Sequence, residues 1–402
     1  MTSEWHEVPL RELVGYISKG IAPSYAEEAS ESTIRVLNQK CNRNFRISYG
    51  DSRLHDTLKK KVPPERYVKP DDILINSTGA GTAGRIAQIE DVPSATTIDG
   101  HMILIRSNGK VTQKFLGYAL KAHQWEVLQL DEGSTGQTEL NRDRLLDEIM
   151  INYPVSLDEQ NAIVGTLESI DRKLIVNEQL NDNLEQQAQA IYHERFETVS
   201  PNDLPSDWRI VTLGEVATIS NKSFNPLKEP EILLEHYSIP AFDEARFPVF
   251  ELSTSIKSNK FIIDASCFMI SKLNPTTKRV WKPYCLTGNA VCSTEFIVYK
   301  AKDQSITDFL YSVIDSGSFS DFMCSHVTGS TGSRQRTTPS DTLSYELILP
   351  SEDELAEFQS LVSPMYAQMR INAIENDKLK RLRDSLLPKL MSGEIDVSSV
   401  HL

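Results

Sequence analysis

A glycine-rich stretch is the most obvious candidate for chemistry in this 402-residue sequence. Residues 79–84 read GAGTAG, which fits the GxGxxG pattern of a dinucleotide-binding turn and follows an apolar, strand-like segment. That pattern binds a pyrophosphate when a helix begins directly after it, because the helix N-terminus then faces the phosphates. The residues that follow are RIAQIEDVPSATT, in which Pro93 and β-branched residues leave no room for such a helix. We therefore expect no dinucleotide, while a turn whose bare backbone a ligand or DNA can approach stays open.

Other patterns that would indicate catalysis are missing from the sequence. An adenine methyltransferase needs an Asn/Asp-Pro-Pro-aromatic motif, and LNPT at 273–276 lacks the second proline and the aromatic residue. There is no GxxxxGK[ST] loop for ATP, and the eight histidines show no metal-ligand spacing. The nearest match to a nuclease centre is residues 171–173, within an acidic helical segment. We expect no catalytic residue and no metal site in this chain.

Length, cysteine content and charge indicate the class of protein to which the chain belongs. A chain of this length predicts two or three domains. Five scattered cysteines without a CxxC pair, an N-terminus without an export signal and the lack of a long apolar run predict a cytoplasmic protein with no membrane segment. The net charge of −14 is uneven, since residues 157–200 hold three basic and nine acidic residues. The remaining segments are closer to neutral, so a basic face for nucleic acid is neither required nor excluded.

The two halves of the chain repeat each other. Trp5 and Trp208 open similar segments, and DDILINS at 71–77 corresponds to SCFMISK at 266–272. GSTG occurs at 133–136 and again at 329–332, and each copy leads through a short apolar strand to a proline, Pro154 or Pro350. A long amphipathic pattern follows each proline, so the repeat predicts the order unit, helix, unit, helix.

Both amphipathic patterns predict long helices with a heptad seam. Apolar residues alternate at spacings of three and four, from Ile163 to Ile191 and from Phe358 to Leu386. Pro364 lies inside the second pattern and predicts a kink or a late helix start. Four seam residues are asparagines that would pair if the helices pack antiparallel, and so fix the helix–helix register; the alternative is a polar, slightly rotated stripe. They are Asn177, Asn181, Asn372 and Asn376.

These observations predict an α+β protein with a pseudo-twofold internal repeat. Two β-rich globular domains at 1–156 and 201–350 would be separated by two long helices packed as an antiparallel coiled coil. The first helix would lie in 157–200, and the second, with a C-terminal tail, in 351–402.

The order of these elements resembles the specificity subunit of Type I restriction-modification enzymes. The resemblance lies in the Trp start, in Asp72-Ile73-Leu74 with Gly79 and Gly84-Arg85-Ile86, in the GST loop, in a Pro-x4-EQ-x-x-I entry to the long helix, and in LMSGEIDV at 390–397. It covers nearly the whole chain. The second copy departs from it, because it lacks the GxGxxG-like stretch and has DELAEF where the first has DEQNAI.

The resemblance implies a non-catalytic subunit that reads DNA for others. Each globular domain would be a target-recognition domain for one half of a bipartite site in double-stranded DNA, and the helices would set the spacer. The partners would be two methyltransferase subunits and, for cleavage, motor-nuclease subunits, which together form an adenine-DNA methyltransferase and site-specific deoxyribonuclease. S-adenosylmethionine, ATP and Mg would be bound by those partners and not by this chain. The alternative is a two-armed coiled-coil adaptor between proteins, with no role on DNA.

Candidate DNA contacts lie in polar loops, where Arg and Gln suit base reading and Lys suits phosphate. Each could equally be an ordinary solvated surface residue. In the first domain they are Lys40, Arg43 and Arg46, with Ser134, Thr135 and Gln137 in the GSTG loop. In the second they are Lys272, Lys278, Arg279, Arg334, Gln335 and Arg336.

Overall fold

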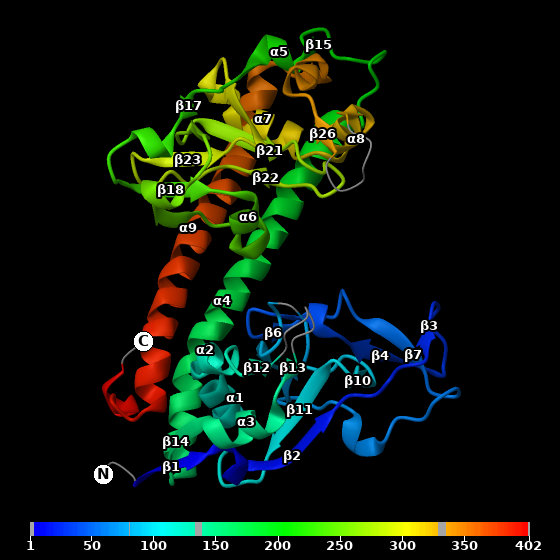
Figure 1. The fold of residues 1–402 in the computed structure, drawn as a ribbon. Coiled ribbons are helices and arrows are strands. Elements are labelled where there is room, and N and C mark those ends of the chain that lie inside the picture. Colours follow the sequence, from blue (N-terminus) through cyan, green and yellow to red (C-terminus); the bar gives the residue numbers. More distant parts are fainter. Residues whose placement is uncertain (1–3, 80, 133–138, 329–334, 401–402) are drawn as a thin grey trace. The chain divides into compact units, whose positions relative to one another are not determined.

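The computed structural model describes residues 4–79, 81–132, 139–328 and 335–400. It divides into two compact units: unit 1 comprises residues 1–173 and 380–402, and unit 2 comprises residues 174–379. Two long helices, α4 (Leu157–Tyr192) and α9 (Glu352–Met391), each contribute to both units. Figure 1 shows β-strands and short helices gathered around a part of these helices in each unit. The predicted α+β class, with two β-rich units and two long helices, is confirmed.

Two four-stranded sheets form most of unit 1. One has the order β2-β11-β8-β9 and is antiparallel throughout. The other has the order β10-β4-β7-β3, in which β10 and β4 are parallel. Three two-stranded pairs, β1-β14, β5-β6 and β12-β13, complete the unit. The strands are β1 (Trp5–Pro9), β2 (Val14–Lys19), β3 (Tyr25–Ala26), β4 (Thr33–Leu37), β5 (Asn42–Arg43), β6 (Arg46–Ile47), β7 (Arg53–Asp56), β8 (Ile73–Asn76), β9 (Ile86–Gln88), β10 (Thr96–Ile98), β11 (Met102–Ser107), β12 (Asp131–Glu132), β13 (Glu139–Leu140) and β14 (Met150–Pro154).

Helix α1 (Gln113–Ala122) joins the antiparallel sheet of unit 1 to α4. The Thr112 side chain caps its N-terminus by accepting a hydrogen bond from the Phe115 N–H. Phe115, Leu116 and Ala119 are buried with Ile73 and Ile103 of the sheet, in the same core as the start of α4. Two shorter helices, α2 (Gln124–Val127) and α3 (Arg142–Glu148), follow α1. This core holds α4 firmly against the globular part of unit 1.

Two family-motif residues at the start of α4 have structural roles. The buried Gln160 accepts a hydrogen bond from the Thr112 N–H (2.9 Å) and donates one to the Pro154 carbonyl (2.9 Å). The Trp5 indole N–H donates to Glu159 (3.3 Å). These contacts tie the helix start to β14, to the cap of α1 and to β1, which explains the EQ pair without any contact to DNA.

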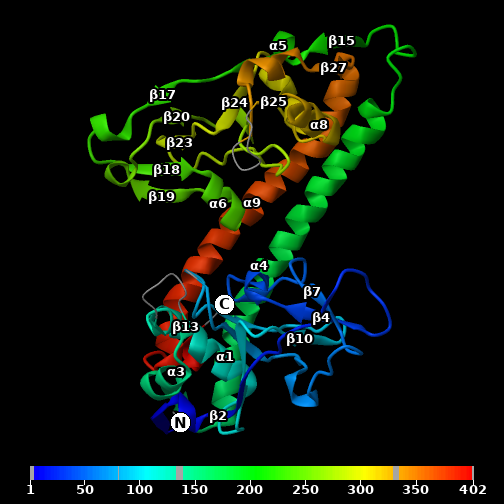
Figure 2. The same ribbon diagram turned by 45° about the vertical axis from the view of Figure 1, so that its right-hand side comes forward.

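Unit 2 repeats much of this arrangement. The sheet β16-β24-β21-β22 matches β2-β11-β8-β9, and the pairs β15-β27 and β25-β26 match β1-β14 and β12-β13. A five-stranded sheet, β17-β20-β23-β18-β19, holds the parallel pair β18-β23, and its strands are labelled in this order from top to bottom in Figure 2. The strands are β15 (Arg209–Thr212), β16 (Ala217–Ile219), β17 (Ser223–Phe224), β18 (Leu233–Tyr237), β19 (Val249–Leu252), β20 (Lys260–Ile262), β21 (Cys267–Ser271), β22 (Val280–Trp281), β23 (Ala290–Ser293), β24 (Phe296–Ala301), β25 (Val327–Thr328), β26 (Arg336–Thr337) and β27 (Glu346–Leu349).

The core of unit 2 lies between its antiparallel sheet, α7 and the long helices. Phe309 of α7 packs edge-on against Phe196 and Phe358, with ring centroids 5.4 and 6.0 Å apart, and all three rings are fully buried. The shorter helices are α5 (Leu213–Val216), α6 (Ile239–Ala245), α7 (Thr307–Ile314) and α8 (Gly317–Ser325). Helices α7 and α8 follow β24 as α1 and α2 follow β11 in unit 1.

The long helices run antiparallel where they meet within each unit. In unit 2 Asn177 donates to Asn376 (2.9 Å) and Asn372 donates to Asn181 (2.8 Å). The residue numbers of the contacts therefore increase along α4 while they decrease along α9. Helix α9 begins at Glu352 and continues through Pro364. A late helix start at Pro364 was therefore a wrong expectation. Phe358 and Val362 before the proline and Tyr366 after it are all buried in the unit 2 core, which keeps the chain helical there.

A buried ionic cluster fastens the end of α9 within unit 1. Asp171 of α4 accepts hydrogen bonds from Arg383 (2.9 Å), Lys121 (3.1 Å) and the Tyr118 hydroxyl (2.9 Å). Burial acts to raise the pKa of Asp171, but Lys121 and Arg383 outweigh it and hold that pKa below the ordinary value. Arg383 of α9 thus serves as a counterion of Asp171.

No helix among the described residues is both long enough and apolar enough to cross a bilayer.

Candidate nucleic-acid interface

In unit 1 the GSTG hairpin sits at the end of strand β8. The Leu140 N–H donates to the Ser77 carbonyl (2.7 Å), and Glu139 forms a β-bridge with Thr78. These contacts fix the two-stranded stem, β12-β13. The tip of the hairpin, with the predicted contacts Ser134, Thr135 and Gln137, lies outside the described residues.

The polar segment 39–46 packs on the same strand end. The Gln39 side chain donates to the Thr78 hydroxyl (2.8 Å), and the Asn42 side chain donates to the Arg85 carbonyl (2.8 Å). Lys40 and Arg43 are exposed there, while Arg46 is half-buried. The fold therefore brings the predicted contacts Lys40, Arg43 and Arg46 into one neighbourhood with the hairpin stem and the glycine-rich turn.

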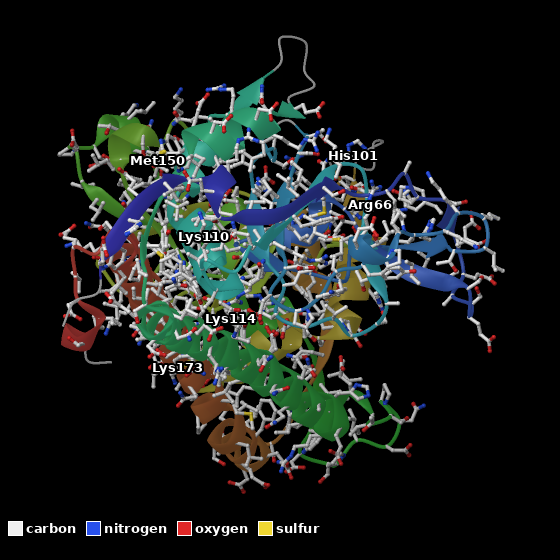
Figure 3. All side chains as sticks on the ribbon, turned by 90° about the horizontal axis from the view of Figure 1, so that it is seen from below. Arg66, His101, Lys110, Lys114, Met150 and Lys173 are labelled. Atoms are coloured by element: carbon white, nitrogen blue, oxygen red, sulfur yellow. The ribbon has the colours of Figure 1, made fainter. Side chains whose placement is uncertain are left out.

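His101 is an exposed residue of this neighbourhood that the sequence reasoning missed. Its Nδ1 lies 2.9 Å from the Thr78 hydroxyl oxygen. The Gln39 side chain donates to the same oxygen, so the Thr78 hydroxyl links His101 to segment 39–46. Figure 3 shows His101 on the same side of unit 1 as Arg66 and away from Lys173 of α4.

In unit 2 the second hairpin stem takes the equivalent place. The Thr337 N–H donates to the Lys272 carbonyl (3.1 Å), Arg336 bridges Leu273, and the Asn274 N–H donates to the Gln335 carbonyl (2.9 Å). Three of the predicted contacts, Lys272, Gln335 and Arg336, thus lie close together. Arg334 lies outside the described residues.

Arg336 is held by an acidic residue of its own unit. Its guanidinium makes two hydrogen bonds to the Glu295 carboxylate, at 3.0 and 2.9 Å. The Arg336 hydrogen bonds keep the pKa of Glu295 below its ordinary value. The Arg336 side chain is still 41% exposed, so the paired guanidinium can also face a ligand.

Lys278 and Arg279, two other predicted contacts, are engaged with acidic groups of unit 2. Lys278 Nζ donates to the Asp315 carbonyl (2.7 Å) and lies 2.8 Å from its carboxylate. Arg279 makes two hydrogen bonds to Asp243, at 2.5 and 2.8 Å, and only 13% of its side chain is exposed. These ion pairs give both residues a structural role that the sequence did not indicate.

The repeated hydrogen-bond pattern shows which residues of the two units correspond. The Asn76 N–H donates to the Arg85 carbonyl and the Ser271 N–H to the Arg279 carbonyl, each at 2.9 Å, so Arg85 and Arg279 occupy the same position. By the same criterion His101 corresponds to Glu295, because their carbonyls accept from Ser77 and Lys272. The bridges to Thr78 and Leu273 pair Glu139 with Arg336. An alignment of the two halves around β9 and β22 could have added Arg85 to the candidates.

The chain is similar to known DNA-specificity subunits. A family model described as Type I restriction modification DNA specificity domain matches residues 2–186. Those residues are similar to the DNA specificity domain of that family. The MjaIX specificity subunit of the Type I restriction enzyme of Methanocaldococcus jannaschii is 24% identical over 96% of this chain and 93% of its own length. The HindI specificity subunit of Haemophilus influenzae is 32% identical over 23% of this chain and 20% of its own length.

A solved structure shares the fold of this chain. The S subunit of a Type I restriction-modification system from M. genitalium has a TM-score of 0.57 at 16% identity, and the likeness covers 97% of this chain and 96% of that one. The predicted resemblance to Type I specificity subunits is confirmed. The comparisons support a DNA-specificity subunit and give no support to the coiled-coil adaptor.

Within the specificity domain, the GxGxxG-like stretch forms a turn between antiparallel strands. The stretch lies between β8 and β9, which pair with each other, so a strand and not a helix follows it. The rejection of a dinucleotide site from the sequence agrees with this topology. No group of three or more His, Cys, Asp or Glu side chains in the described parts of the chain could hold a metal ion.

The four seam asparagines form a hydrogen-bonded set between α4 and α9. Besides the two pairs described above, the Asn376 side chain donates to the Leu174 carbonyl (3.3 Å) and that of Asn181 donates to the Met369 carbonyl (3.2 Å). Asn177, Asn372 and Asn376 are buried. A shift of one helix along the other would leave these amides unpaired, so we expect them to fix the register, as predicted.

Proposed function

We propose that this chain is the sequence-reading subunit of a Type I restriction-modification complex. Each unit contacts one half of a bipartite site in double-stranded DNA, and α4 and α9 set the length of the spacer. The observation that carries the proposal is the repeated site. Two units of one chain present a hairpin stem at the same strand end, with different side chains at corresponding positions. One fold with two sets of surface residues suits the reading of two different half-sequences.

The chain itself does no chemistry in this proposal. Two methyltransferase subunits bind S-adenosylmethionine and modify adenine in the site, and motor-nuclease subunits with ATP and Mg cleave unmodified DNA. The complex acts in the cytoplasm. Support comes from the specificity subunit of M. jannaschii, which matches this chain over almost its whole length.

Methylation mapping tests the assignment of one unit to one half-site. Cells that express the chain with its methyltransferase partners should show a bipartite methylated motif. Arg336→Ala should relax the motif in one half only, because a lost bidentate base contact costs about 1–3 kcal/mol of discrimination. Glu139→Ala, at the corresponding position of unit 1, is the matched variant and should affect only the other half. If either variant altered both halves equally, the division of labour between the units would be wrong.

A further inference from the structure

The three glycines of the turn between β8 and β9 have different reasons to be glycine. All have positive φ, at 111° for Gly79, 70° for Gly81 and 83° for Gly84. A Cβ on Gly79 would lie 2.3 Å from the Thr82 hydroxyl oxygen, and one on Gly84 would lie 2.9 Å from the Val127 carbonyl oxygen. A Cβ on Gly81 would meet no atom of the described residues within 4 Å. Packing and positive φ together explain Gly79 and Gly84, whereas only the positive φ favours glycine at position 81, where the backbone is exposed and no described neighbour excludes a side chain.

The Arg85 side chain folds over this bare backbone. One of its guanidinium nitrogens donates to the Gly81 carbonyl at 3.1 Å, and the side chain is exposed. Its main chain is fixed by the hydrogen bonds that its carbonyl accepts from Asn76 (2.9 Å) and Asn42 (2.8 Å). The Arg85 head group is thus carried on a rigid base and held by a neutral acceptor.

Comparison with unit 2 shows what is particular to Arg85. Arg279 has the same place in the fold, but there Asp243 occupies the guanidinium. Within the described part of unit 1, no acidic side chain forms an ion pair with Arg85, Lys40 or Arg43. Segment 39–46 packs against the turn through Gln39 and Asn42, so the three cations share one neighbourhood.

We propose that Gly81 and Arg85 form a DNA phosphate site of unit 1. The bare backbone at Gly81 lets a DNA strand approach, and the Arg85 guanidinium leaves the Gly81 carbonyl to bind phosphate oxygens. The exchange is favourable because a hydrogen bond to a phosphate anion is stronger than one to a neutral carbonyl, and the planar guanidinium can form two such bonds. The site positions the strand and does not read its bases. This inference rests on the proposed DNA-reading function and adds a residue outside the predicted contacts.

Binding of the full chain, with its partner subunits, to duplexes with and without the mapped site tests the proposal. Arg85→Gln should weaken binding to both duplexes by the same factor, about ten-fold. It should also reduce the slope of log Kd against log salt by about 0.9, the value for one lost phosphate contact. Gly81→Asn should weaken binding as well, because asparagine tolerates positive φ but its side chain obstructs the strand.

Two control variants separate binding from folding. Gly109 also has positive φ (95°) and open space around its missing Cβ, so Gly109→Asn carries a similar backbone cost and should bind DNA like wild type. Arg172→Gln removes an exposed arginine of α4, away from the turn and from segment 39–46, and should leave the salt slope unchanged. Thermal melting of each variant checks that the fold is intact.

The outcomes distinguish this proposal from the function on which it rests. If the wild-type complex prefers its site and a folded Arg85→Gln variant keeps both affinity and salt slope, the phosphate site is wrong while the DNA-reading function stands. Loss of discrimination at one base pair, without a change in salt slope, would replace the phosphate contact by a base contact and also overturn the proposal. A wild-type complex that shows no preference for any DNA would refute the proposed function itself.

Discussion

The buried asparagine pair between α4 and α9 permits a quantitative test of the helix register. Asn177 is 1% exposed and Asn376 is 7% exposed, and the Asn376 side-chain oxygen accepts a hydrogen bond from Asn177. Replacing Asn177 alone by leucine removes this donor and leaves the acceptor buried and unpaired. Such a group costs about 1–3 kcal/mol, so we expect Asn177→Leu to lower the free energy of unfolding by about 2 kcal/mol.

The double variant Asn177→Leu with Asn376→Leu should recover most of that loss. It removes the donor and the acceptor of this hydrogen bond at once, and two apolar side chains that face each other avoid the unpaired acceptor. The Glu375 carboxylate, which also accepts from Asn177 (2.7 Å), loses that donor in the single and the double variant alike, so the difference between them reports the asparagine pair. The coupling energy of the double-mutant cycle should therefore be on the order of 2 kcal/mol. Asn183→Leu, at an exposed position on the same helix, is the control and should change stability by less than about 0.5 kcal/mol.

Amide hydrogen exchange between residues 174 and 184 is the appropriate assay. It measures the local opening free energy of α4, so the result does not depend on whether the two units unfold together. The argument fails if the single and double variants lose stability additively, because the two asparagines would then not act as a pair. It also fails if Asn177→Leu behaves like Asn183→Leu.

Two further predictions concern unit 2 and the spacer. Burial raises the pKa of Asp315 to about 6, so its stabilising contribution is complete below the unfolded value of 3.8 and is lost as pH rises through 6. Between pH 4 and pH 7 the free energy of unfolding of unit 2 should fall by up to about 3 kcal/mol, and its melting temperature should fall with it. The Asp315→Asn variant should show a flatter pH profile. An equal fall in the wild type and the variant would contradict the assignment to Asp315. Inserting four residues after Asn181 keeps the apolar seam and lengthens α4 by about 6 Å, on the order of two base pairs. Methylation of a library of spacer lengths should show a longer preferred gap, and an active insertion variant with an unchanged gap would show that the helices do not set it.

The repeat, the long helices and the family resemblance could be read from the sequence because each depends on local pattern. The heptad seam requires apolar residues at fixed spacing wherever the helix packs, and GSTG and the following proline mark the same turn in each half. The rejection of a dinucleotide site was also local, since Pro93 and the β-branched residues after Gly84 cannot begin a helix there. Pro364 shows the limit of such reasoning, because burial of Phe358, Val362 and Tyr366 outweighs a local preference to break the helix.

The state of each candidate side chain was decided by the tertiary structure. Lys278, Arg279 and Arg336 look alike in the sequence as cations in polar loops, yet they are paired with Asp315, Asp243 and Glu295. An ion pair depends on which distant segment the fold brings within about 4 Å, and no pattern of neighbours along the chain carries that information. The converse holds for Arg85. In the sequence Arg85 is only one residue of the family motif. In the structure its guanidinium lies beside Gly81, and no acidic side chain of the described part of unit 1 pairs with it. Sequence determined where cations stand along the chain, and the fold, by placing or withholding a carboxylate, decided which of them remain available to an anion.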